Sequence, residues 1–194
     1  MTLNEIQKKL GWSNVALARF LGVTTKTVYN WKHDSEIKYG HKAAIEKLKS
    51  QLPAKLQIKL LYPDSKMPTR AHEWDAGLDL YARFVEDHVE YPGYLISTGI
   101  AAHIPEGYVG LIFPRSSIRN TDLILKNSVG VIDSGYTGEI MFTFQRLKKH
   151  DRNYHHGDKI GQLVILPLPK IEIEVVDKLP ETERGDNGHG STGN

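Results

Sequence analysis

Hydrophobic residues recur at two different spacings along the chain. In the first fifty residues they lie three or four positions apart, which is the spacing of one face of an α-helix. Ser13 stands where the N-cap of a second helix is expected, and Pro53 closes the region. Four groups of this kind predict four short helices: Ile6 and Leu10; Leu17, Phe20 and Leu21; Val28 and Trp31; Ile45 and Leu48.

From Leu56 onward the pattern changes to short β-rich runs. Such runs, separated by Gly, Pro, Asn and Asp, are typical of strands joined by turns. They predict an all-β unit and read KLQIKLLY (55–62), EGYVGLIFP (106–114), EIMFTF (139–144), GQLVILPL (161–168) and IEIEVV (171–176). The join at residues 51–55 is short, so we expect the two parts to be closely tethered.

Charge is distributed unevenly between the two parts. The 194-residue chain has a formal net charge of +2. Residues 1–55 hold 10 Lys and Arg against 4 Asp and Glu, a net of +6, whereas residues 56–194 hold 15 against 19, a net of −4. This asymmetry indicates two units with different partners.

The composition excludes several kinds of site and of location. The chain has no cysteine, which excludes disulfides, thiolate zinc sites and cysteine nucleophiles. No apolar run approaches the roughly 20 residues that span a membrane. The first twelve residues lack the apolar stretch of a signal peptide. We therefore expect a cytoplasmic globular protein.

The segment NVALARFLGVTTKTVYNW (14–31) carries a specific arrangement of small and apolar residues. Ala18 is small enough for two helices to cross closely, Gly22 permits a sharp turn four residues later, and Val28 points back into the core. This arrangement resembles the helix-turn-helix of phage repressors, and the resemblance covers residues 3–50. A fusion of such a unit to a second domain suggests a phage or prophage origin.

The resemblance implies a recognition helix at about residues 25–31. Exposed hydroxyls, amides and ammonium groups on such a helix can reach base edges or phosphates. The alternative is a helical bundle that docks protein, because such bundles share the same apolar spacing. The residues expected to contact DNA are Thr24, Thr25, Lys26, Thr27, Asn30 and Lys32.

Five short stretches in the second part combine glycine with polar residues. They are AGLDL (76–80), PRSS (114–117), NSVGVIDSGYTGEI (127–140), GDKIGQLVI (157–165) and RGDNGHGSTG (184–193). In this order and spacing they resemble the five motifs of trimeric dUTP pyrophosphatases (dUTPases), and the match covers residues 56–194. The family implies a distorted jelly roll or barrel and a homotrimer with sites shared between subunits.

The residues also suit a triphosphate on chemical grounds. A triphosphate needs cationic and hydroxyl donors that converge from several loops. Asp133 lies in a glycine-flanked turn, where its carboxylate either deprotonates a water or closes an Asx turn. Mg²⁺ prefers phosphate oxygens and water, so no carboxylate cluster is required for it. The candidate donors are Arg115, Ser116, Ser117, Gln162, Arg184, Ser191 and Thr192.

The resemblance then implies a role for each position. Asp133 would activate the water that attacks the α-phosphorus. Asp79, in the first stretch, would support the site by contacting other site residues. Tyr136 would lie under the deoxyribose, where a 2′-hydroxyl would clash. Arg115, Ser116, Ser117 and Gln162 would hold the phosphates, and a hairpin with Asn127, Gly130, Val131 and Ile132 would read the uracil.

The last stretch would be a mobile arm that closes over bound nucleotide. Arg184 would reach the γ-phosphate, with further contacts from His189, Gly190, Ser191 and Thr192. Two positions depart from the usual family pattern. His189 replaces a phenylalanine that stacks on uracil, and Lys159 replaces an arginine, which keeps the charge and loses the fork geometry.

The predicted organisation is α+β and multidomain. It comprises a helix-turn-helix domain (1–52), a β-domain (53–183) and a C-terminal arm (184–194). The predicted reaction is hydrolysis of dUTP to dUMP and pyrophosphate with Mg²⁺. Two alternatives are a nucleotide-sensing transcriptional regulator and the related dCTP deaminase, which places a glutamate at about Thr143.

Overall fold

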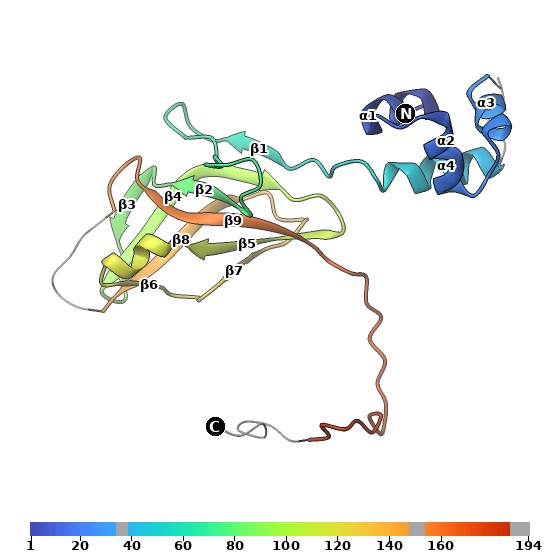
Figure 1. Ribbon diagram of the computed structural model, residues 1–194. Helices are drawn as coiled ribbons and strands as arrows, with labels where there is room; N and C mark the ends of the chain where they lie inside the picture. Colours follow the sequence, from blue (N-terminus) through green and yellow to red (C-terminus); the bar gives the residue numbers. More distant parts are fainter. Residues whose placement is uncertain (34–38, 148–153, 187–194) are drawn as a thin grey trace.

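The computed structural model describes residues 1–33, 39–147 and 154–186. Four helices at the N-terminus lie apart from a β-rich unit, and an extended segment joins the two (Figure 1). This arrangement confirms the predicted order of an all-α part followed by an all-β part. Among the described residues, no helix has the length and apolar character needed to cross a membrane.

The N-terminal helices begin and end where the sequence carries capping residues. Ser13 accepts a hydrogen bond from the backbone of Ala16 and caps the second helix, as predicted. Gly22 ends that helix with a φ of 68°, a left-handed conformation that glycine adopts without strain. The helices are α1 (Leu3–Leu10), α2 (Asn14–Leu21), α3 (Thr25–His33) and α4 (Tyr39–Lys49).

The link between the two parts is shorter than the sequence suggested. Leu52 packs against the helical core, whereas Leu56 packs against the β core. Only Pro53, Ala54 and Lys55 lie between these two anchors. Three extended residues reach about 10 Å, so the helices stay close to the start of the β-domain.

The β-domain consists of two antiparallel sheets. One has the order β1-β4-β8-β6, with β3 also paired to β4, and the other has the order β2-β9-β5-β7. The first contains β1 (Gln57–Leu60), β3 (Phe84–Asp87), β4 (Gly93–His103), β6 (Leu123–Leu125) and β8 (Glu139–Arg146). The second contains β2 (Gly77–Tyr81), β5 (Tyr108–Pro114), β7 (Gly130–Ile132) and β9 (Lys159–Pro167), and a 3₁₀ helix η1 (Ser116–Asn120) follows β5.

The side chains between the sheets form one core. Phe142, Phe144 and Ile160 are fully buried there, together with Leu163 and Ile104. Inward-facing residues alternate with outward-facing ones along β8, which gives this strand its apolar–polar pattern. The core therefore fixes β5, β8 and β9, whose ends carry the candidate site residues.

Two predictions about strands need correction, and one strand was not predicted. The run at residues 55–62 forms only the four-residue β1, and the eleven-residue β4 was not predicted. The run at residues 171–176 is not a strand: residues 168–186 leave the β-domain as an extended segment (Figure 1). Its apolar residues are exposed, Ile173 at 86% and Val175 at 96%, because no strand of the described chain pairs with it.

Candidate active site

A buried carboxylate on β2 contacts two cations, one just after the end of β5 and one at the start of β9. Asp79 on β2 accepts a hydrogen bond from Arg115 Nε at 2.8 Å. Its other oxygen lies 2.7 Å from the ammonium of Lys159, at the start of β9. The hydrogen bond with Asp79 raises the pKa of Lys159 above its ordinary value, against a smaller opposing effect of burial, so this ammonium stays charged at neutral pH.

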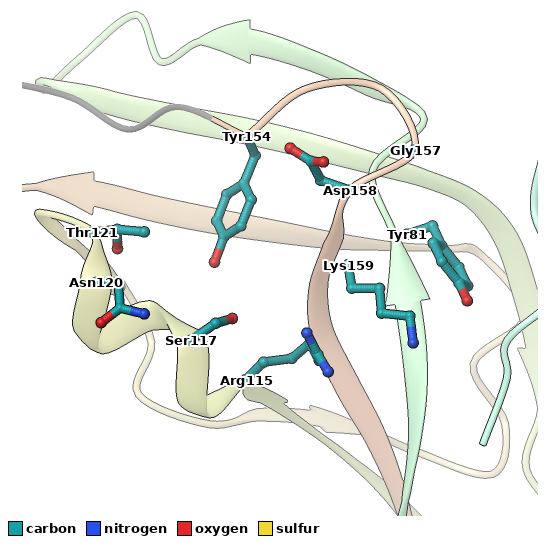
Figure 2. Close-up of a pocket in the computed structure, with 9 residues that line it drawn as sticks. All are labelled: Tyr81, Arg115, Ser117, Asn120, Thr121, Tyr154, Gly157, Asp158 and Lys159. Carbon is teal, nitrogen blue, oxygen red and sulfur yellow. The ribbon is translucent and has the colours of Figure 1, made fainter. Parts of the chain in front are cut away.

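This arrangement orients the Arg115 guanidinium. Asp79 engages Nε, and Figure 2 shows Arg115 and Lys159 beside each other. Both line a pocket of about 430 Å³. Ser117 on η1 faces the same space. Two fixed cations and a hydroxyl form a site for the oxygens of a phosphate chain. The remaining walls come from Tyr81, Asn120, Thr121, Tyr154, Gly157 and Asp158.

Several of these walls were not predicted from the sequence. Tyr81 hydrogen-bonds Thr69 at 2.6 Å between their hydroxyls, which holds one wall of the pocket. Tyr154 is 9% exposed and packs its ring on Phe144, with 5.3 Å between ring centroids. Tyr154 precedes a glycine stretch without belonging to it, so no local signal marked it as a pocket residue.

The segment predicted as a uracil-reading hairpin lines a second pocket, of about 310 Å³. The segment joins β6 to β7, which pair with β8 and β5 rather than with each other, so it is a connecting loop and not a hairpin of paired strands. Ser128 in this loop has a φ of 60°. A Cβ on Gly130 would collide with the Ile112 side chain, so glycine is required for β7 to begin this close to β5. Residues that line this pocket are Leu95, Ile112, Asn127, Gly130, Val131, Ile132, Asp133, Tyr136, Glu139, Ile140, Met141 and Thr143.

Asp133 lies in the turn that follows β7. The turn is closed by the main chain, because the backbone N–H of Tyr136 donates to the carbonyl of Asp133 at 3.0 Å. Within the described residues no side-chain hydrogen bond closes this turn, so the Asx-turn alternative is wrong. The carboxylate of Asp133 is exposed in the second pocket and free to contact a water.

The two pockets share no lining residue. The cations Arg115 and Lys159 line the first, whereas Asp133 and Tyr136 line the second. The two cations and the Asp133 carboxylate therefore line different pockets of one chain. We name each pocket after the part of the nucleotide predicted to bind there: the first is the phosphate pocket and the second the nucleoside pocket.

The remaining predicted site residues lie outside both pockets. Ser116 is exposed beside Ser117, and Gln162 lies on β9 opposite Asp79 with its side chain against Gly77. Arg184 lies in the extended segment after β9. The predicted arm residues His189, Gly190, Ser191 and Thr192 lie outside the described residues.

The side chains at the phosphate pocket indicate how Mg²⁺ could be held. Asp79 is engaged by two cations, and the phosphate pocket presents cations, hydroxyls and an amide besides the single carboxylate of Asp158. Among the described residues there is no cluster of three or more His, Cys, Asp or Glu side chains. The pocket therefore fits a Mg²⁺ ion that enters on phosphate oxygens and water.

Comparison with known proteins agrees with this geometry. The deoxyuridine 5′-triphosphate nucleotidohydrolase of Clostridium tetani is 43% identical over 142 residues, covering 71% of this chain and 96% of that protein. The Mycobacterium leprae enzyme of the same name is 42% identical over 147 residues, covering 71% and 94%.

Solved structures of phage enzymes share the fold of the β-domain. The dUTPase of Staphylococcus bacteriophage 80alpha with dUpNHpp has a TM-score of 0.62 and 30% identity, covering 72% of this chain and 98% of that chain. A mutant dUTPase of phage phi11, described with a structural Mg(II) ion, has a TM-score of 0.54 and 30% identity, covering 64% and 97%.

The profile of the dUTPase family matches residues 64–193. This range contains all five glycine-rich stretches and both pockets, and it leaves the four N-terminal helices outside. The match spans more than half of the chain, and the curated relatives are covered almost completely. The chain therefore belongs to the dUTPase family.

Proposed function

We propose that the chain hydrolyses dUTP to dUMP and pyrophosphate, with Asp133 activating the attacking water. The observation that carries this proposal is the pairing of two site types in one domain. Arg115, held by Asp79, faces the phosphate pocket, and an exposed carboxylate faces the nucleoside pocket. Catalysis of phosphoryl transfer rests mainly on such positioning and charge stabilisation.

The phosphate chain would bind along Arg115, Ser117 and Lys159, with Ser116 and Gln162 as further donors. Bound Mg²⁺ supplies positive charge that neutralises the phosphate oxygens. The chain's own cations hold the triphosphate in one orientation, so that the α-phosphorus faces the water near Asp133. Orientation of this kind lowers the entropic cost of reaction.

The nucleoside would occupy the nucleoside pocket. Asn127 and the backbone of the loop between β6 and β7 present donors and acceptors for the uracil edge, and Tyr136 forms the wall for the deoxyribose. Thr143 lines this pocket at the position where a dCTP deaminase places a glutamate. A threonine lacks the carboxylate for deamination, which favours hydrolysis of dUTP over deamination of dCTP.

The two pockets share no lining residue, which is compatible with a site that draws on more than one chain. We propose a homotrimer in which the phosphate pocket of one subunit faces the nucleoside pocket of the next. The exposed segment at residues 168–186 would carry Arg184 and the arm at 184–194 toward a neighbouring site. The β-domain would then span residues 53–183.

Turnover of dUTP, dCTP, dTTP and UTP by one purified sample tests the proposed function. We expect dUTP to be the one substrate hydrolysed at an appreciable rate. The loop between β6 and β7 would exclude the thymine methyl of dTTP, and Tyr136 would exclude the 2′-hydroxyl of UTP. A chain ending at Glu183 should keep this preference but turn over poorly, since it lacks the arm. Comparable rates with UTP or dTTP would contradict the proposal.

The N-terminal helices favour a second function, the binding of duplex DNA. Helix α3 follows α2 after a glycine turn, and the hydroxyl of Thr24 caps α3 by accepting from the backbone of Thr27 at 3.1 Å. One side of α3 is exposed and carries Thr25, Lys26, Tyr29, Asn30 and His33. Together with the charge of +6, this α3 face suits contacts to phosphates and base edges.

Lys32 does not belong to the proposed α3 face. Its side chain is half-buried and donates to Asn14 Oδ1 at 2.6 Å and to Gln7 Oε1. We expect it to join α1, α2 and α3 rather than to contact DNA. Tyr29, 57% exposed and in contact with the His33 ring, takes its place on the face.

A titration of labelled duplex DNA across salt concentrations tests the second function. We expect weak binding by the full chain, with a Kd of roughly 10⁻⁶ to 10⁻⁴ M at physiological salt. A chain starting at Lys55 should not bind. Lys26→Glu should weaken binding more than the same charge change at Lys8 on α1; equal losses would contradict the α3 face.

A further inference from the structure

Tyr136 is held in place by two neighbouring residues that the proposed function does not use. Its hydroxyl donates to the backbone carbonyl of Glu139 at 2.8 Å. Its ring also lies directly against the backbone of Gly138. A Cβ built on Gly138 would lie 2.5 Å from Tyr136 Oη, 2.7 Å from Cζ and 2.9 Å from Cε2. Real Cβ atoms do not approach other atoms so closely, so the ring occupies space that only glycine leaves open.

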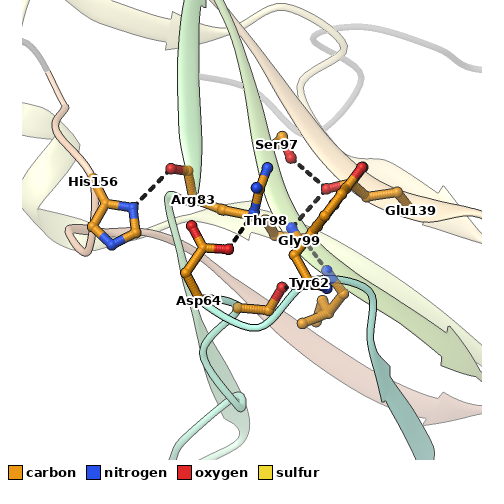
Figure 3. Close-up of polar contacts among 10 residues, drawn as sticks. Tyr62, Asp64, Arg83, Ser97, Thr98, Gly99, Glu139 and His156 are labelled. Atoms are coloured by element: carbon orange, nitrogen blue, oxygen red, sulfur yellow. Dashed lines mark hydrogen bonds and ion pairs between the residues drawn. The ribbon is translucent and has the colours of Figure 1, made fainter.

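Glu139 is itself fixed by the neighbouring strand. The register of β4 against β8 shifts between Ser97 and Ala101, so the strand bulges there. The Glu139 carboxylate fills this bulge: it accepts a hydrogen bond from the backbone of Gly99 at 2.6 Å and one from the hydroxyl of Ser97 (Figure 3). A hydrogen-bonded carboxylate of this kind anchors the start of β8 and with it the carbonyl that receives Tyr136.

These contacts form a continuous connection from the β4 bulge to the wall of the nucleoside pocket. The bulge positions Glu139, the Glu139 carbonyl positions the Tyr136 hydroxyl, and Gly138 leaves the space that the ring occupies. Tyr136 is 42% exposed, so packing against the core does not hold the ring by itself. The orientation of Tyr136 therefore depends on these two residues.

We propose that Gly138 and Glu139 are positioning residues that set the sugar selectivity of the enzyme by holding the Tyr136 ring. The proposal rests on the proposed function, in which Tyr136 faces the deoxyribose. A ring at one fixed height fits a 2′-hydrogen and excludes a 2′-hydroxyl. If the ring is displaced or mobile, it no longer fits the deoxyribose, and the rate with dUTP falls. The rate with the ribonucleotide is already low, so it changes little.

Gly138→Ala is the direct test. The new methyl must push the Tyr136 hydroxyl away from Glu139, since the nearest clash is with Oη. We expect kcat/KM for dUTP to fall about 10- to 100-fold, the usual effect of a displacement of about 1 Å in a binding site. The rate with UTP should change less, so the dUTP/UTP selectivity ratio falls about tenfold or more.

Gly135→Ala is the matched control. Gly135 lies in the same loop, but a Cβ there meets no atom within 4 Å. The same substitution should leave the selectivity ratio within about twofold of wild type, because no side chain has to move. Unfolding temperature measured for both variants separates a local displacement from loss of the fold.

Tyr136→Phe and Glu139→Gln keep the test decisive if Gly138→Ala fails to fold. Tyr136→Phe removes the hydrogen bond to Glu139 and keeps the ring, so selectivity should fall by a smaller factor of about three. Glu139→Gln weakens the anchor in the β4 bulge and should act in the same direction. An unchanged selectivity ratio in Gly138→Ala, or in both of these variants, would overturn the proposal.

Binding of dUpNHpp and of its ribonucleotide counterpart separates this proposal from the proposed function. Calorimetry needs no turnover, so it measures sugar discrimination even in a protein that does not hydrolyse dUTP. Absence of dUTP hydrolysis by the wild type would refute the proposed function. A preference for dUpNHpp that Gly138→Ala abolishes would still support the positioning role, and a preference that this variant leaves intact would refute it.

Discussion

Asp133→Asn is expected to lower kcat for dUTP hydrolysis by about two to four orders of magnitude, the range for loss of a positioned general base. The amide keeps the size of the side chain but cannot take a proton from water. The turn itself should persist, because its closing hydrogen bond joins the main chain of Asp133 and Tyr136 at 3.0 Å.

The variant should still bind nucleotide. The phosphate donors Arg115 and Lys159 line a pocket that Asp133 does not enter, so the affinity for dUpNHpp should stay close to that of the wild type. Asp87→Asn is the control, since this exposed aspartate on β3 lines neither pocket. Wild-type turnover by Asp133→Asn would show that another group activates the water.

The helical part was the more predictable from its sequence. Apolar residues three and four apart mark the side of a helix that must be buried, and Leu17, Val28 and Leu48 are buried as that spacing predicts. Capping is equally local, because Ser13 needs only the next three residues to act. The engagement of Lys32 was not predictable, since its acceptors Gln7 and Asn14 lie 25 and 18 positions away.

The β-domain was less predictable because strands depend on distant partners. Strand β4 contains a bulge at Gly99, where the alternation of apolar and polar residues breaks, and no signal for one long strand remains. The run at residues 171–176 alternates well, yet it has no partner within the described chain. Alternation states which side of a strand would be buried but not whether a neighbouring strand is present.

In the candidate site, too, local features were predictable from the sequence and contacts between distant strands were not. Glycine-rich stretches identified Arg115, Ser117 and Asp133 because the family resemblance attaches roles to those positions. The contact of Asp79 with both Arg115 and Lys159 depends on the pairing of β2 with β9 and of β9 with β5. Separation of the phosphate donors from Asp133 into two pockets likewise appears only when both sheets are assembled.

That separation leads to an expected recovery of activity when two inactive variants are mixed. Arg115→Ala removes the oriented cation from the phosphate pocket and should lower turnover at least about a hundredfold, as does the loss of other transition-state donors. Asp133→Asn removes from the nucleoside pocket the carboxylate that we propose activates the water. If each site takes Arg115 from one subunit and Asp133 from its neighbour, some sites in mixed oligomers are intact.

The size of the recovery follows from the arrangement. In an equal, random mixture a site is intact when one neighbour is the Asp133→Asn chain and the other is the Arg115→Ala chain, in the right order. Each condition is met half of the time, so about a quarter of all sites in the unselected mixture should be active. Purification on both tags removes trimers of a single kind, and each remaining cyclic trimer has one such ordered pair, so about one site in three should then be active. Co-expression with two different tags, purification on both and a dUTP assay measure this fraction, and light scattering should give the mass of three chains.

A mixture of Arg115→Ala with Ser117→Ala is the control, because its two substitutions affect the same pocket. Both residues line the phosphate pocket of the same chain, so every site in this mixture lacks one of them and no recovery is expected. The two mixtures contain the same kinds of oligomer and differ only in whether the lost groups belong to one pocket or two. A doubly tagged oligomer of Arg115→Ala and Asp133→Asn that stays as inactive as either variant would mean that one chain completes its own site.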